Sequence, residues 1–285
     1  MTPTSPPVAA WELGMRLREI RDRKELHRAD VASALGITQN YLSNIEHGRR
    51  TIAEDKLHII IGIYDIEDQR DELFALRGIS NRRGWWSRYN TKLPTELVKL
   101  FSYLHGASAL RSYEGSLVSG FLQTENYARA VHRGNGTLIA PSEVDTRVAA
   151  RMRNQMRLFG DDPLPATIIM SEATLWHQVG GTAVLAGQLE RLLDLIDDVP
   201  SLDLRIIPFA AGGYGALGGG TFHVLEFGGR RVRRLAWHET VTVTQLLDDE
   251  DCIHHYDLSF GEALDHTADR DTSKKLITRA LEEIT

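Results

Sequence analysis

Residues 26–51 (LHRADVASALGITQNYLSNIEHGRRT) constrain the fold of this chain more than any other segment. Val31 and Leu35 lie four residues apart, which is the spacing of one face of a helix. Gly36 permits the positive φ angle with which many helices end, and so allows a sharp turn. Thr38 then offers a side-chain oxygen that can cap a following helix. The segment therefore predicts two short helices joined by a tight turn.

The second of these helices has two different faces. Leu42 and Ile45 mark an apolar face for packing, and the other face carries the amide side chains of Gln39, Asn40 and Asn44. Because glutamine and asparagine can pair bidentately with adenine, a helix of this kind fits the major groove of DNA. A generic helix pair with solvated amides is the alternative. The small-residue turn, the amide-rich start and the Gly48-Arg49-Arg50 exit together favour a helix-turn-helix. We expect phosphate contacts from Arg28, Thr38, Ser43, Arg49 and Arg50.

The flanking segments predict three further helices. Leu13, Leu17 and Ile20 follow the i, i+4, i+7 spacing of an amphipathic first helix. A fourth helix is indicated by Leu57, Ile60, Ile61 and Tyr64, and a fifth by Leu73, Phe74 and Leu76, ending near Arg77. This all-α module of five helices, with the second and third as the reading pair, resembles the phage-repressor-like, or XRE, helix-turn-helix family.

That resemblance assigns roles to individual residues. Gln39 falls on the family's base-reading glutamine, and Asn40 falls on its neighbour. Arg28 stands where the family commonly has a glutamine that braces both a phosphate and the reading residue. The resemblance therefore implies a phosphate contact for Arg28 but puts the bracing between two glutamines in doubt.

Length and composition bound the remaining possibilities. The 285 residues suffice for two domains, and no apolar run approaches the ~20 residues that a membrane span needs. Cys252 is the only cysteine, which excludes an intrachain disulfide and a cysteine-based zinc site. The start, MTPTSPPVAA, lacks the pattern of a signal peptide, and we expect residues 1–10 to form a disordered arm. We expect a cytoplasmic protein.

The net charge of −6 is distributed unevenly. Residues 1–51 hold eight Lys and Arg against six Asp and Glu, whereas residues 52–80 hold three against seven. Basic groups therefore gather where a helix-turn-helix would meet phosphates, and acidic groups lie behind it. Arg82, Arg83, Arg88 and Lys92 could also lie against DNA, although a solvated basic linker is the favoured interpretation.

The pattern changes beyond the helical module. We expect a helix-turn-helix domain over 11–78, a linker over 79–83 and a second domain over 84–285. Helices are predicted over 93–110, 125–131, 142–158 and 184–196, and again from 253 to the end of the chain. Strands are predicted over 166–170, 204–207, 221–227, 232–237 and 241–246, with a hairpin at Gly228-Gly229. This order indicates an α+β domain with a mainly antiparallel sheet.

The second region resembles the domain of unknown function that follows the helix-turn-helix in antitoxin-like regulators of actinomycetes. GWWSRY at 84–89, LVSGFLQTENYARAV at 117–131 and PFAAGGYGALGGGTFHVLEF at 208–227 carry the resemblance. Ser119 departs from the family's usual proline, and 97–110 lacks the acidic residue expected to pair with Arg111. The resemblance implies a protein partner, encoded by a neighbouring gene. A small-molecule or partner pocket could involve Trp85, Trp86, Arg111, Gln123 and Tyr127, although these side chains would serve packing equally well.

No complete catalytic or metal-binding constellation is present in the sequence. The glycine-rich run at 210–220 lacks the Gly-Lys-Ser/Thr ending of a phosphate loop. His238-Glu239 lacks the second histidine of a zinc peptidase, because that position is Thr242. We therefore expect no enzyme, no metal and no cofactor, but a DNA-binding transcriptional regulator that acts as a homodimer on double-stranded DNA. The alternatives are an antitoxin-like module that sequesters a small protein and a ligand-gated repressor.

Overall fold

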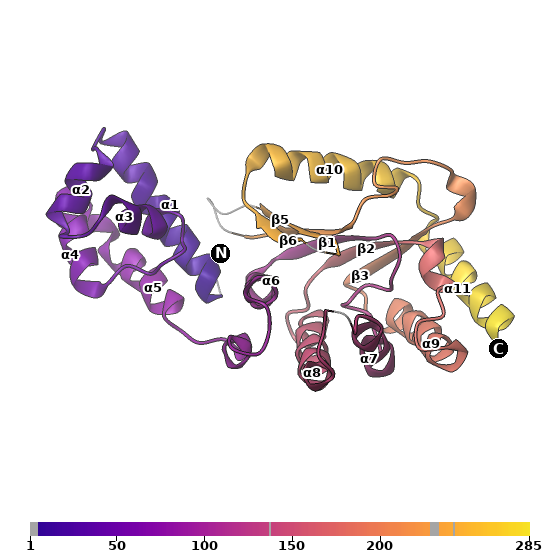
Figure 1. Ribbon diagram of the computed structural model, residues 1–285. Helices are drawn as coiled ribbons and strands as arrows, with labels where there is room; N and C mark the ends of the chain where they lie inside the picture. The colour runs from indigo at the N-terminus through magenta and orange to yellow at the C-terminus, as the bar shows by residue number, and fades with distance from the viewer. Residues whose placement is uncertain (1–4, 137, 229–233, 242) are drawn as a thin grey trace. The chain divides into compact units, whose positions relative to one another are not determined.

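The computed structural model describes residues 5–136, 138–228, 234–241 and 243–285. The chain divides into two compact units (Figure 1). Unit 1 comprises Met1–Ser87 and Phe227–Arg233, and unit 2 comprises Arg88–Glu226 and Arg234–Thr285. Within the described residues, no helix combines the length and apolar character that crossing a membrane requires.

Unit 1 is a cluster of helices around one apolar core. Its helices are α1 (Pro6–Arg23), α2 (Arg28–Ala34), α3 (Gln39–Glu46), α4 (Glu54–Tyr64) and α5 (Arg70–Ser80), with the 3₁₀ turn η1 (Glu67–Gln69). A further 3₁₀ turn, η2 (Trp85–Tyr89), spans the boundary with unit 2, which begins at Arg88. The apolar positions that the helical spacing identified form the core: Leu13, Leu17, Ile20, Val31, Leu35, Leu42, Ile45, Leu57, Ile60, Ile61, Tyr64, Leu73 and Leu76. Hydrophobic periodicity therefore located the packing face of each helix correctly.

Two boundaries of unit 1 differ from the expectation. Helix α1 begins at Pro6, and Val8, Ala9 and Ala10 are buried, so a disordered arm is wrong for residues 6–10. Proline suits the first position of a helix, and the apolar residues after it extend the buried stripe. Residues 1–4 lie outside the described part. The expected linker also begins too early, because Ile79 and Ser80 belong to α5.

Unit 2 contains a six-stranded sheet in the order β3-β2-β1-β4-β5-β6. The strands are β1 (Ala109–Glu114), β2 (Ala166–Ser171), β3 (Leu202–Ile207), β4 (Thr221–Glu226), β5 (Arg234–Glu239) and β6 (Thr244–Leu247). Its α-helices are α6 (Thr95–Gly106), α7 (Glu125–Gly134), α8 (Val144–Gln155), α9 (Thr182–Asp198), α10 (Glu250–Asp265) and α11 (Arg270–Ile284). Shorter 3₁₀ turns are η3 (Pro141–Glu143), η4 (Met156–Leu158), η5 (Glu172–Leu175) and η6 (Phe209–Ala211).

The sheet is mixed, which corrects the expectation of a mainly antiparallel one. Strand β1 runs parallel to β2, and β2 runs parallel to β3, whereas the pairs β1–β4, β4–β5 and β5–β6 are antiparallel. The parallel half arises because α7 and α8 connect β1 to β2, and α9 connects β2 to β3. Strands β4 and β5 pair antiparallel as expected. The hairpin turn expected at Gly228-Gly229 lies partly outside the described residues, as do residues 232–233 of the expected strand.

Strand β1 lies at the centre of the sheet, yet the sequence did not predict it. The expected helix over 93–110 ends at Gly106 as α6, and the chain then enters β1. The strand places Leu110, Ser112 and Glu114 on one face, so two buried polar residues interrupt the apolar alternation that identifies a strand.

Helices cover both faces of this sheet (Figure 1). Helix α10 lies on one face, where Phe260 and Ala263 pack against Tyr113, Ile169 and other residues of the sheet. Helices α7, α8 and α9 lie on the opposite face (Figure 1), the face toward which Ser112 and Glu114 of β1 point. Unit 2 is therefore a three-layer α/β/α arrangement.

Candidate functional site

The start of α3 presents the amide side chains that the sequence singled out. The Thr38 hydroxyl oxygen accepts a hydrogen bond from the Tyr41 backbone N–H at 3.1 Å, as its position before the helix predicted. Gly36 has φ of +64°, which confirms the tight turn. Gln39 and Asn40 are exposed and Asn44 is half-buried. The first turn of α3 therefore offers hydrogen-bonding groups to solvent on a capped helix.

Helix α3 is held against α1 by close backbone contact. A Cβ atom at Gly14 of α1 would overlap the carbonyl oxygen of Ile45 and lie 2.9 Å from that of Glu46. At the end of α3, Gly48 has φ of +66°, and a Cβ there would lie 2.8 Å from the backbone nitrogen of Trp11. Both glycines are required because no side chain fits between the two segments.

A buried ion-pair network centred on Glu46 joins helices α1, α2 and α3. The Glu46 carboxylate is fully buried and accepts hydrogen bonds from Arg21 Nε at 2.6 Å and Arg21 Nη2 at 3.1 Å. Arg28 Nε donates to the same carboxylate at 3.1 Å. The hydrogen bond from Arg21 to Glu46 raises the pKa of the arginine. The network fixes the orientation of α3 relative to the helices behind it, and sequence periodicity gave no signal for it.

This network also changes the interpretation of Arg28. Its side chain is about one-third exposed, and its Nε atom is hydrogen-bonded to Glu46. Arg28 therefore anchors α2 to α3, and a phosphate contact, if made, would use the other nitrogens of the group.

The basic exit from α3 is also ordered by local contacts. The backbone N–H groups of Arg49 and Arg50 both donate to the Asn44 carbonyl oxygen, at 2.8 and 3.1 Å. Both side chains are exposed, and the Arg50 guanidinium lies over the Tyr41 ring, with its Cζ 5.2 Å from the ring centroid. Ser43 is half-buried on the same helix. Apart from Arg28 on α2, the predicted base-reading and phosphate-contacting side chains thus belong to the continuous segment 38–50.

The five residues expected to line a pocket in the second region are divided between the two units. Trp85 and Trp86 belong to unit 1, and their rings make an edge-to-face contact. Gln123 is buried, donates to the Val118 carbonyl oxygen at 2.7 Å and accepts from Arg151 at 2.6 Å. Tyr127 is fully buried on α7. These hydrogen bonds and this burial give Gln123 and Tyr127 packing roles.

Arg111 has acidic partners that are distant in the sequence. Its Nη2 atom lies 2.9 Å from a Glu226 carboxylate oxygen on β4 and 2.8 Å from an Asp257 oxygen on α10. Arg234 of β5 pairs with the same Asp257. The acidic partners of Arg111 therefore come later in the sequence, and not from the segment that precedes it. Together these ion pairs link α10 to the sheet.

A buried polar cluster lies on the other face of β1. Glu114 accepts hydrogen bonds from Ser112 at 3.0 Å and Thr221 at 2.9 Å, and the Ser112 oxygen lies 3.0 Å from His223 Nδ1. Burial raises the pKa of Glu114 to about 7 and lowers the pKa of His223 to about 4. The hydrogen bonds from Ser112 and Thr221 lower the pKa of the Glu114 carboxyl group, but by less than its burial raises it.

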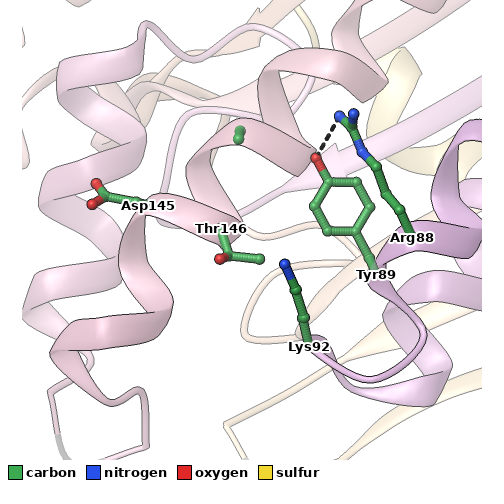
Figure 2. A pocket seen from close by; sticks show the side chains of 6 residues that line it. Arg88, Tyr89, Lys92, Asp145 and Thr146 are labelled. Carbon is green, nitrogen blue, oxygen red and sulfur yellow. Dashed lines mark hydrogen bonds between the residues drawn. The ribbon is translucent and has the colours of Figure 1, made fainter.

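A cleft on unit 2 is lined in part by Arg88 and Lys92, which the sequence analysis interpreted as part of a solvated basic linker. Arg88, Tyr89 and Lys92 form one side, and Asp145, Thr146 and Ala149 of α8 form the other; the volume is about 360 Å³. Figure 2 shows the Lys92 ammonium group between Tyr89 and Thr146, whereas the Asp145 carboxylate points away from them. Within the described residues, no group of three His, Cys, Asp or Glu side chains is placed to hold a metal ion.

Comparisons with known families match two regions of the chain. Residues 98–279 match the family described as Domain of unknown function (DUF5753), and residues 12–73 match the family described as Helix-turn-helix domain. The searches of curated proteins and of solved structures found no match.

Proposed function

Since the chain belongs to the family described as Domain of unknown function (DUF5753), with a helix-turn-helix domain preceding that region, we propose that it is a sequence-specific transcriptional regulator of the XRE type. The exposure of Gln39 and Asn40 on the capped first turn of α3 carries this proposal. Their amide groups are free of the core and can pair with base edges in the major groove.

Positioning and reading are divided between different residues. The exposed guanidinium groups of Arg49 and Arg50 contact phosphates and set the register of the module on the duplex. Gln39 and Asn40 read bases, and each good bidentate pair is worth roughly 1–3 kcal/mol of discrimination. The Glu46 network contributes indirectly, since it holds α3 at a fixed orientation behind these contacts.

The proposal includes a homodimer. One short reading helix contacts few base pairs, and a dimer gains specificity by placing two such helices in successive major grooves, about 34 Å apart. The operator is then pseudo-palindromic, with half-sites about one helical turn apart.

Genome-wide recovery of bound DNA fragments tests the proposal. We expect enriched fragments that share a pseudo-palindromic motif, and a gel shift on those fragments that random DNA of equal length does not compete away. Failure to enrich any motif, together with equal affinity for random DNA, would contradict a sequence-specific regulator. A pull-down that captures a small protein while no motif is enriched would instead support the antitoxin-like alternative.

A further inference from the structure

The end of α3 is supported by one side of α1. Gly14 contacts the last turn of α3, and Trp11, three residues earlier, contacts the residue at which α3 has ended. A Cβ atom at Gly48 would overlap the Cα atom of Trp11 and lie 2.8 Å from its backbone nitrogen. Residues three apart lie on the same side of a helix. Trp11 is therefore the part of α1 that supports the backbone directly before Arg49 and Arg50.

The side chain of Trp11 is buried by something other than the apolar core of unit 1. Ala9 and Leu13 belong to that core, and a residue two positions away on a helix points about 200° from them. Trp11 is nevertheless only 9% exposed. Its ring packs edge-to-face against the ring of Phe227, with the centroids 6.3 Å apart and the planes at 80°. This is a favourable geometry for two aromatic rings. Phe227, itself buried, therefore covers Trp11 on a side that the core does not reach.

Phe227 comes from a part of the sequence far beyond the helix-turn-helix. It directly follows Glu226, the last residue of β4, and lies within the region 98–279 that matches the domain of unknown function. The helix-turn-helix match covers residues 12–73. Phe227 is nonetheless part of unit 1. The unit that carries α3 is therefore completed by a residue of the second matched region.

We propose that Phe227 is a positioning residue for DNA binding, which acts through Trp11 on the exit of α3. The proposal rests on the DNA-binding function proposed above. Phe227 is buried and contributes no contact to DNA itself. By holding Trp11 it fixes the backbone at Gly48, and with it the direction in which Arg49 and Arg50 leave the helix.

The base-reading end of α3 is held independently of Phe227. Gln39 occupies the first position of the helix, whereas Gly48 lies beyond its last residue. The first turn is fixed by the Thr38 cap, and the last turn by the contact with Gly14. Loss of the Phe227 ring should therefore weaken phosphate contacts and leave base reading intact. A residue that only contributes stability would not separate these two effects.

Salt-dependent DNA binding by the full chain, measured on operator and on random DNA, tests this proposal. Phe227→Leu removes the ring and retains an apolar side chain. We expect about tenfold weaker binding of both DNAs and a salt slope smaller by about 1–2, because each phosphate contact contributes about 0.9. The ratio of the two affinities should not change. The matched control Phe209→Leu replaces a phenylalanine of unit 2 that is 62% exposed, and should bind like the wild type. Circular dichroism checks that each variant is folded.

Trp11→Leu removes the same ring pair from the other side and should have the same effect. The double variant Trp11→Leu, Phe227→Leu should lose little more than either single variant, since both act through one contact. A folded Phe227→Leu chain with the wild-type salt slope overturns the proposal, as do additive losses in the double variant. Loss of discrimination between the two DNAs overturns it as well. Absence of DNA binding by the wild type would instead contradict the function proposed for α3, and this inference with it.

Discussion

Gly14 of α1 lies directly beneath the carbonyl group of Ile45 in α3, with no room between them for a single methyl group. The backbone of the first helix thus supports the backbone of the helix that carries Gln39 and Asn40. Because the contact is between main-chain atoms, neither side can relieve a clash by changing a side-chain rotamer. The contact therefore sets the distance between α3 and α1.

Gly14→Ala should destabilise unit 1, because the added methyl group would force α3 away from α1. Overpacking of this kind typically costs about 1–3 kcal/mol, and here the obstacle is backbone that cannot rotate away. Gly62→Ala is the matched control, since nothing lies within 4 Å of a Cβ in that position of α4, and it should stabilise by up to about 1 kcal/mol. Urea unfolding followed by circular dichroism measures both. Equal midpoints for the two variants would contradict the packing described.

Thr38→Ala should cost about 1 kcal/mol of stability, because it removes the oxygen that accepts the Tyr41 N–H at the start of α3. Thr38→Ser retains that oxygen and should lose much less. The same denaturation experiment distinguishes the two. An equal loss in both variants would show that the methyl group of Thr38, and not the cap, supports the helix.

Glu46→Gln should destabilise unit 1 strongly, by about 3–5 kcal/mol, since it leaves the buried Arg21 charge without its partner. Arg28→Gln should cost far less, because that side chain is partly exposed and Arg21 still satisfies Glu46. Thermal unfolding of both variants checks this order. A larger loss for Arg28→Gln would mean that α2, and not α1, is the main anchor of α3.

Local signals made unit 1 predictable. Gly36 and Thr38 determine the backbone conformation of the residues next to them, and the apolar positions follow a helical period. The turn, the helix cap and the packing faces could therefore be identified from short stretches of sequence. The partners of Glu46 could not, because Arg21 lies 25 residues away and charged side chains carry no periodic signal. The same reason explains Arg111, whose acids Glu226 and Asp257 are contributed by β4 and α10.

The central strand and the cleft of unit 2 escaped prediction for related reasons. Burial of Ser112 and Glu114 removes the apolar alternation from β1, so the parallel pair that β1 forms with β2 was not predicted. Arg88 and Lys92 resemble a solvated linker in sequence, since the wall of α8 opposite them is more than fifty residues further along the chain.

Glu114 should make unit 2 less stable as the pH rises. Its pKa of about 7 in the folded state exceeds the ordinary value of 4.5, so the folded protein retains a proton that the unfolded chain releases. Stability from this group is complete below about pH 4.5, falls as the pH approaches 7 and stays low above it. Glu114→Gln should remove that slope and gain up to about 3 kcal/mol above pH 7 relative to the wild type. Unfolding curves between pH 5 and 8 measure it. Parallel pH profiles for the two proteins would contradict the raised pKa.

DNA binding by Gln39→Ala and Arg50→Ala, measured on the recovered operator and on random DNA over a range of salt concentrations, tests the central claim most directly. We predict that Gln39→Ala reduces discrimination between the two DNAs by about 1–3 kcal/mol and leaves affinity for random DNA unchanged. Arg50→Ala should weaken binding to both DNAs similarly and reduce the salt slope by about 1. Equal losses on operator and random DNA for both variants would contradict the assignment of α3 as the base-reading helix.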